Sequence, residues 1–193
     1  MKNSFLAIAY YTKGTGYEKE IENLIASLKR FNLAYDIKAI KSLGSWQKNT
    51  QYKALFCKNM LAKHKNNLLY LDADATVEEC PQLFEDIKCD IAVHFRNGKE
   101  LLSSAIYLSN NEKVKNLLDR WIELCAIHPK IWDQKLLQRA IKDSDATVFH
   151  LPPEYCCIFD LMAHQVKKPV ILQHQASRKY KNTMQQEICA SQQ

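Results

Sequence analysis

Residues 68–76 read LLYLDADAT, an apolar run that ends in two aspartates two positions apart. The run Leu68–Leu71 has no polar face, which is typical of a buried strand in a parallel sheet. In an extended chain, residues i and i+2 project to the same side, so Asp72 and Asp74 are expected to lie together just beyond this strand. Ligands of α/β proteins bind beyond the carboxyl ends of the strands, and we therefore expect a functional site at these aspartates.

Strands and helices alternate along the chain on both sides of this segment. The apolar patterns predict strands at 5–11, 33–40, 68–71, 91–93, 105–108, 147–151 and 169–172, and helices at 17–31, 52–60, 114–125 and 133–141. This alternation indicates an α/β fold with a mainly parallel central sheet flanked by helices. No repeat or linker divides the chain, so we expect a single domain over residues 1–193, with a polar, frayed tail from about residue 182.

The composition describes a soluble globular protein of 193 residues, 47% apolar and 25% charged. Only four glycines are present, and they fit neither the dinucleotide fingerprint nor the Walker phosphate loop. A site for phosphate would therefore have to rely on cations. The formal net charge of +6 suits an anionic ligand, but the lysines are scattered, and no nucleic-acid partner is expected.

The compartment is indicated by three further features of the sequence. Seven cysteines include no Cys-x-x-Cys pair, and most resemble small core residues of a protein in a reducing compartment. The short apolar run at the N-terminus lacks the length of a signal-peptide core. No stretch approaches the roughly 18 apolar residues of a membrane span. These features predict a cytoplasmic protein without a transmembrane segment.

The chemistry of two neighbouring carboxylates suggests a metal site. Like charges so close together repel unless one is protonated or a cation lies between them, so Asp72 and Asp74 suit a hard divalent ion such as Mg²⁺ or Mn²⁺. An acidic pair after a strand is also a common turn former or helix cap. The surrounding sequence is needed to distinguish a metal site from a turn or a helix cap.

Two enzyme classes carry a similar acidic motif after a hydrophobic strand. The stretch 72–77, DADATV, resembles the motif of haloacid-dehalogenase-like phosphatases, in which Asp72 would be the nucleophile. It also resembles the Asp-x-Asp metal motif of nucleotide-sugar transferases with the GT-A fold. The phosphatase motif normally follows the first strand of its domain and is accompanied by a late acidic pair. Here a strand-helix-strand-helix unit comes first, and Asp143 and Asp145 fall on an expected loop, so the order favours the transferase.

The resemblance to GT-A nucleotide-diphospho-sugar transferases extends over nearly the whole chain. It is carried by YT at 11–12, Trp46, Lys53, LYLDAD at 69–74, WDQ at 132–134, LPxxY at 151–155 and PVILQH at 169–174. It implies a sheet that binds a sugar nucleotide, usually a UDP-sugar, with a divalent metal (Mn²⁺ or Mg²⁺) between enzyme and diphosphate. The reaction implied is sugar transfer to an acceptor hydroxyl. A catalytically inactive nucleotide-sugar-binding module on the same scaffold is an alternative.

The resemblance also implies roles for particular residues at the phosphate end of the site. Asp74 would bind the metal directly, Asp72 would contact the metal or the ribose, and His174 would be the third metal ligand. Lys181, with Arg178 and its neighbour Lys179, would help to neutralise the leaving diphosphate. Relatives often place a glycine and a lysine after this histidine, where this chain has QAS at 175–177.

At the base and sugar ends, the resemblance places Tyr11 and Thr12 beside the nucleotide base, Lys53 near the nucleotide or its phosphates, and Ser104 beneath the sugar. Asp133 and Gln134 would border the sugar and the acceptor, where the carboxylate would orient a hydroxyl or act as a base.

Simpler roles are open for several of these residues. Tyr11 suits the core, Lys53 suits a solvated helix face, Asp133 suits a helix N-cap, and His174 suits a surface or capping position. Relatives also often carry a glycine beside Ser104, which this chain lacks.

Overall fold

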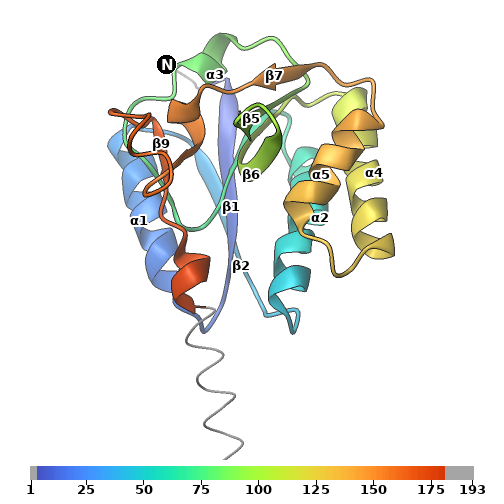
Figure 1. Ribbon diagram of the computed structural model, residues 1–193, viewed down its shortest axis with the longest axis horizontal. Coiled ribbons are helices and arrows are strands. Elements are labelled where there is room, and N and C mark those ends of the chain that lie inside the picture. The colour runs from blue at the N-terminus through green and yellow to red at the C-terminus, as the bar shows by residue number, and fades with distance from the viewer. Residues whose placement is uncertain (1–3, 181–193) are drawn as a thin grey trace, which may run out of the picture.

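The apolar run before the two aspartates forms β3 (Asn67–Leu71), near the middle of a six-stranded sheet (Figure 1). The structure is a computed structural model that describes residues 4–180. The strand order is β2 (Tyr35–Ile40), β1 (Phe5–Thr12), β3, β6 (Glu100–Leu108), β5 (Ile91–Arg96) and β7 (Val148–His150). Leu68, Leu69 and Leu71 are fully buried, which confirms the expected buried strand.

Most neighbouring strands of this sheet run parallel. β1 pairs in parallel with β2 and β3, and β5 pairs in parallel with β7. β6 is antiparallel to both β3 and β5. The reversal is made by a tight hairpin between β5 and β6, in which Asn97 and Gly98 have φ of 52° and 68°. Left-handed conformations of this kind suit an Asn-Gly pair in a hairpin turn. The expected mainly parallel sheet is therefore confirmed, with one antiparallel strand.

Helices cover both faces of the sheet. α1 (Tyr17–Arg30) packs on one face, and α2 (Trp46–Lys63), α4 (Glu112–Ile127) and α5 (Asp133–Lys142) pack on the other (Figure 1). Alternate residues of β1 reach the two faces: Ala7 and Ala9 join the core under α1, whereas Ile8 and Tyr10 join the core under α2 and α4. α2 begins at Trp46 because the Ser45 hydroxyl caps it, accepting from the Lys48 amide at 3.2 Å.

A small second sheet follows the two aspartates and was not expected from the sequence. β4 (Ala75–Val77) pairs antiparallel with β9 (Ile171–Gln173), which pairs in parallel with β8 (Cys157–Ile158). The short helices α3 (Leu83–Asp86) and η1 (Pro153–Cys156) complete the elements, and a helical turn covers 176–180. Because β9 lies beside β4, the segment after residue 173 is brought next to Asp74.

The ends of several elements differ from expectation. α2 is longer than predicted, the strand expected at 33–40 begins at Tyr35, and the last strand is shifted to 171–173. The predicted tail from about residue 182 lies outside the described residues. None of the helices between residues 4 and 180 combines the length and apolar character needed to cross a membrane.

Candidate functional site

A pocket of about 420 Å³ opens where β1 and β3 end. The volume falls within the usual range for small-molecule sites. Eight of the residues singled out from the sequence line it: Tyr11, Thr12, Lys53, Asp72, Asp74, Ser104, Asp133 and Gln134. These residues come from β1, α2, the turn after β3, β6 and α5. The fold therefore gathers residues from most of the chain at the edge of the sheet where the aspartates lie.

Lys53 lies at the centre of the pocket floor with only 4% of its surface exposed. Its Nζ is 3.0 Å from Asp72 Oδ1 and 3.1 Å from Asp133 Oδ2, and it donates to the carbonyl and hydroxyl oxygens of Ser103 at 3.0 and 3.2 Å. Burial favours the neutral amine, but the charges of Asp133 and Asp72 outweigh it and raise the pKa of Lys53. Lys53 is thus a buried, charged group and not a solvated helix lysine.

Asp133 is the first residue of α5, and its carboxylate is buried against Lys53. Asp133 Oδ2 also accepts from the Ser103 hydroxyl at 3.0 Å, and its carbonyl accepts from the indole N–H of the buried Trp121 at 3.0 Å. The N-cap position of α5 is Trp132, which makes no side-chain cap. The carboxylate of Asp133 therefore serves the pocket and not the helix end. Its neighbour Gln134 donates from Nε2 to Glu100 Oε1 at 3.2 Å on the pocket rim.

The two aspartates after β3 have different surroundings. Asp72 Oδ1 accepts from the Tyr70 hydroxyl at 2.8 Å as well as from Lys53. Asp74 Oδ2 accepts from the Ala176 amide at 2.6 Å, and only 9% of the residue is exposed. Burial and the charge of Asp72 raise the pKa of Asp74 to about 6. A cation beside the pair would favour the charged form of Asp74.

His174 does not meet these aspartates. Its amide donates to the Asp74 carbonyl at 3.1 Å, but its ring bonds the Thr76 hydroxyl, with 2.9 Å between Nε2 and Oγ1. The ring lines a separate hollow with Glu78 and Arg30, because the pairing of β9 with β4 turns the side chain toward Thr76. Between residues 4 and 180, no three His, Cys, Asp or Glu side chains are placed to hold one metal ion. The expected third ligand is therefore not assembled with Asp72 and Asp74.

The remaining predicted residues take positions around this centre. Thr12 is buried at the end of β1, and Tyr11 both lines the pocket and packs against the core. The Ser104 carbonyl accepts from the Asp72 amide at 3.0 Å, which fixes the turn after β3. Arg178 lines the pocket and pairs with Asp160. Lys181 lies outside the described residues.

Comparison with known proteins bears on the fold. Neither a protein-family model nor a curated protein matches the sequence. Among solved structures, a glycosyltransferase involved in the glycosylation of the major capsid of PBCV-1 matches with a TM-score of 0.70 and 13% identity, over 93% of this chain and 98% of that one. The apo form of glycosyltransferase GlyE of Streptococcus pneumoniae matches with a TM-score of 0.62 and 17% identity, over 90% of this chain and 54% of GlyE. The chain has a glycosyltransferase fold.

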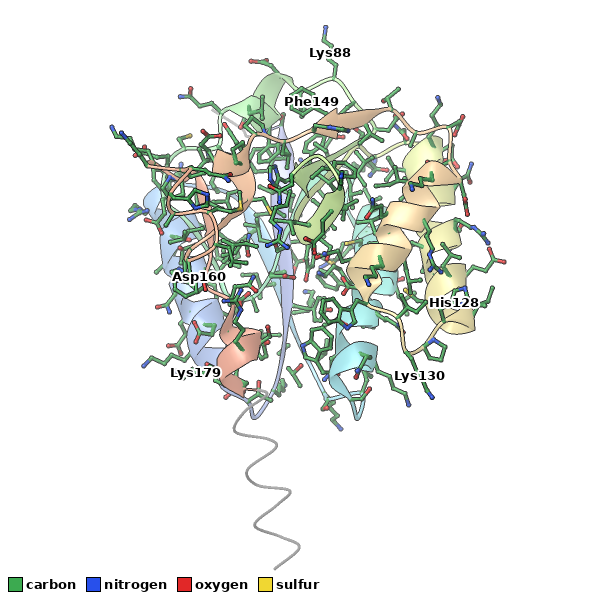
Figure 2. All side chains as sticks on the ribbon, in the orientation of Figure 1. Lys88, His128, Lys130, Phe149, Asp160 and Lys179 are labelled. Atoms are coloured by element: carbon green, nitrogen blue, oxygen red, sulfur yellow. The ribbon has the colours of Figure 1, made fainter. Side chains whose placement is uncertain are left out.

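The pocket of this glycosyltransferase fold has two walls, on opposite sides of β1. In one wall, the α1 wall, Tyr17 at the start of α1 contacts Tyr180, with 5.1 Å between ring centroids. Trp46 and Trp132 form the other wall, at the starts of α2 and α5. Figure 2 shows Lys179 and Asp160 on the side of α1, and Lys130, two residues before Trp132, on the side of α2 and α4.

Several pocket residues were missed in the sequence. Tyr70 lies two positions before Asp72, so strand alternation alone would have placed both on one side. Arg96 and Glu100 line the pocket from the two sides of the β5–β6 hairpin, where they form an ion pair. The Asn97-Gly98 dipeptide was the available signal for that hairpin.

Proposed function

We propose that the protein is a metal-dependent glycosyltransferase of the GT-A type, which moves a sugar from a UDP-sugar to an acceptor hydroxyl. The observation that carries the proposal is the meeting of Asp72, Asp74 and Asp133 in one pocket of a chain with a glycosyltransferase fold. The two solved structures that share the fold are glycosyltransferases, and they suggest the class of reaction. The pocket residues supply the groups that such a reaction needs.

Asp72 and Asp74 would hold Mn²⁺ or Mg²⁺ in this proposal. Carboxylate oxygens are preferred ligands of both ions, and the raised pKa of Asp74 belongs to a carboxylate that a cation would stabilise in its charged form. An ion held there would supply positive charge to stabilise a departing diphosphate. His174 would join the set only in another side-chain rotamer, because its ring now bonds Thr76. Arg178 and Lys181 are the proposed further cations of the phosphate end.

Lys53 would act as a positioning residue in this site. An ammonium has three N–H groups, and four oxygen atoms of Asp72, Asp133 and Ser103 already surround Nζ. Its contribution is therefore to hold the two carboxylates together at fixed places on the pocket floor, by offsetting the repulsion between them. Asp133, held by Lys53 and Ser103, would accept a hydrogen bond from a sugar or acceptor hydroxyl, with Gln134 beside it. Tyr11 and Thr12 would border the base, and Ser104 would shape the floor under the sugar.

The phosphatase interpretation of residues 72–77 has less support. Asp72 Oδ1 is bonded to both Tyr70 and Lys53, so an attack on a phosphorus atom would have to come from Oδ2. The late acidic residues Asp143 and Asp145 pair with surface cations, and neither lines the pocket. A nucleophile without its metal-binding partners would be poorly equipped for that reaction.

Turnover of a panel of UDP-sugars, with and without Mn²⁺, tests the proposed function. We expect metal-dependent release of UDP by the wild-type protein and its loss in Asp74→Asn. The matched control is Asp119→Asn, which removes an exposed carboxylate of α4 outside the pocket and is expected to behave like wild type. UDP binding without turnover of any donor would indicate the inactive module. Hydrolysis of simple phosphate esters without UDP-sugar turnover would indicate the phosphatase.

A further inference from the structure

The second wall of the pocket is an aromatic pair with no part in the donor chemistry described above. Trp46 and Trp132 meet edge to face, with 5.9 Å between ring centroids and an interplanar angle of 79°. Both line the pocket, and Trp132 is 50% exposed. The third tryptophan, Trp121, is fully buried. Burying a large aromatic ring is normally favourable, and a half-exposed indole beside a second indole in one pocket is typical of a ligand-contacting surface.

The aromatic pair is held in place by the packing of three helices. Gln51, on the first turns of α2, donates from Nε2 to the carbonyls of His128 and Ile131 at 3.0 and 2.7 Å. These bonds tie the start of α2 to the loop between α4 and α5, the loop that carries Trp132. The Lys135 ammonium lies 5.9 Å from the centroid of the Trp132 ring. The pair is thus a preformed surface, which reduces the ordering cost of binding.

The position of the pair along the pocket indicates which molecule it faces. Asp74 belongs to the α1 wall, because the segment that donates to it from Ala176 also carries Tyr180, which contacts Tyr17. Asp133 lies on the pocket floor next to the opposite wall, because it directly follows Trp132 in the chain. A donor whose diphosphate lies at Asp72 and Asp74 and whose sugar lies at Asp133 therefore extends toward the tryptophans. The group beyond the sugar is the acceptor.

We propose that Trp46 and Trp132 form the acceptor subsite and that the acceptor is itself a carbohydrate, an inference that rests on the proposed function. A pyranose has apolar C–H faces and a hydroxyl rim, so it can lay a face on an indole while its edge bonds polar groups. The polar groups are present: Asn49, Thr50, Gln134 and the Arg96–Glu100 pair line the same pocket. This mixture suits a sugar better than a lipid chain, because the hydroxyl groups of a sugar can bond these polar side chains, whereas a lipid chain would only shield them from water.

Tryptophan fluorescence during titration with methyl glycosides and lactose tests the subsite without requiring turnover. Trp121 is buried but donates to the Asp133 carbonyl, so the tryptophan variants are needed to assign a change in emission to Trp46 and Trp132. We expect a saturable change with a glycoside, its loss in Trp132→Ala, and its retention in Phe149→Ala, which removes an exposed ring of β7 outside the pocket. Trp132→Tyr keeps an aromatic face and is expected to bind more tightly than Trp132→Ala. Thermal unfolding of Trp132→Ala and Trp132→Tyr shows whether each variant is still folded.

Transfer kinetics then separate this inference from the proposed function. Trp132→Ala is expected to raise the acceptor KM on the order of tenfold, with unchanged affinity for UDP and Mn²⁺. An acceptor KM equal to that of wild type in both Trp46→Ala and Trp132→Ala would overturn the acceptor subsite while leaving the transferase in place. Emission changes with UDP or a serine peptide, but with no glycoside, would also overturn it. Glycoside binding at Trp132 without turnover of any UDP-sugar would support a carbohydrate platform and contradict the proposed function.

Discussion

Lys53 and Asp133 form a buried ion pair, with 3.1 Å between Nζ and Oδ2, although they lie on different helices far apart in the sequence. The pair joins α2 to the first turn of α5 and brings Asp133 to the same floor as Asp72. A buried charge pair contributes little net stability compared with an apolar replacement, but removal of one partner is costly. The buried pair is therefore best explained by its role in positioning the carboxylates of the pocket, and not by a contribution to stability.

Removal of the Lys53 ammonium should destabilise the protein strongly. Lys53→Met leaves the buried carboxylate of Asp133 and the partly exposed carboxylate of Asp72 without their cation, and we expect a loss of about 3–5 kcal/mol in the free energy of unfolding. Lys58→Met on the same helix removes an exposed pair with Asp119 and should cost less than about 1 kcal/mol. Urea denaturation measures both. Equal losses of unfolding free energy in the two variants would show that the buried ion pair stabilises the protein no more than the exposed one.

A second charged cluster, distant from the pocket lining, predicts the acid stability of the fold. Asp36 lies 2.7 Å from Lys38 Nζ, 2.6 Å from Lys63 Nζ and 2.9 Å from His64 Nε2. Burial opposes the charged form, but the hydrogen bonds from these three residues dominate and hold the pKa of Asp36 well below its ordinary value. A lowered folded-state pKa contributes stability that is present above the unfolded pKa of about 4 and is lost as the pH falls below it.

Asp36→Asn should therefore lower the free energy of unfolding by about 1–2 kcal/mol at pH 7 and flatten its dependence on pH below about 4. Chemical denaturation at a series of pH values measures this. The result would contradict the account if the variant and the wild type lost stability in parallel on acidification.

The sequence predicted the centre of the site better than its walls. Leu68–Leu71 and the aspartates after it were located because an apolar run and an i, i+2 spacing are local properties. The partners of Lys53 were not, because Asp72 and Asp133 reach it only when α2 packs beside β3 and α5. Periodicity also carries no information on strand direction, which is why the antiparallel course of β6 was missed.

The small second sheet shows a further limit of sequence patterns. β4 and β9 have three residues each, too few to show an alternation. Their pairing nevertheless decides where the ring of His174 lies, since it sets Thr76 opposite Leu172, and the ring then bonds the Thr76 hydroxyl. The sequence therefore could not predict whether the His174 ring points toward the two aspartates, because the pairing of β4 with β9 sets its direction.

The α1 wall of the pocket depends on a close approach at Gly16. A Cβ added there would clash with the Tyr180 ring, whose hydroxyl lies within hydrogen-bond distance of the Gly16 carbonyl at 3.0 Å and of Glu20 Oε1 at 2.7 Å. Gly16→Ala should displace the Tyr180 ring and loosen the turn at 176–180. Amide hydrogen exchange at Ala176, which donates to Asp74, should then become faster. Gly14→Ala has open space at its Cβ and serves as a comparison for general effects, although its φ of 70° adds backbone strain.

The carboxylate of Asp133 should matter more for transfer than for donor binding. Asp133→Asn keeps the shape of the side chain but removes the charge that would orient a hydroxyl or take its proton. We expect kcat to fall by about 10²–10⁴-fold. Asp143→Asn, at the far end of α5, should keep wild-type kcat because Asp143 pairs with Arg120 outside the pocket. A fall in kcat of less than twofold in Asp133→Asn would remove Asp133 from the reaction.

Calorimetric titration of UDP into the protein, with and without Mn²⁺, shows whether Asp72 and Asp74 form a metal-dependent donor site. We predict that wild type binds UDP tightly only with Mn²⁺, that Asp74→Asn loses this metal-dependent binding, and that Asp133→Asn retains it. UDP binding of equal strength with and without Mn²⁺, or unchanged in Asp74→Asn, would contradict a donor site built on Asp72 and Asp74.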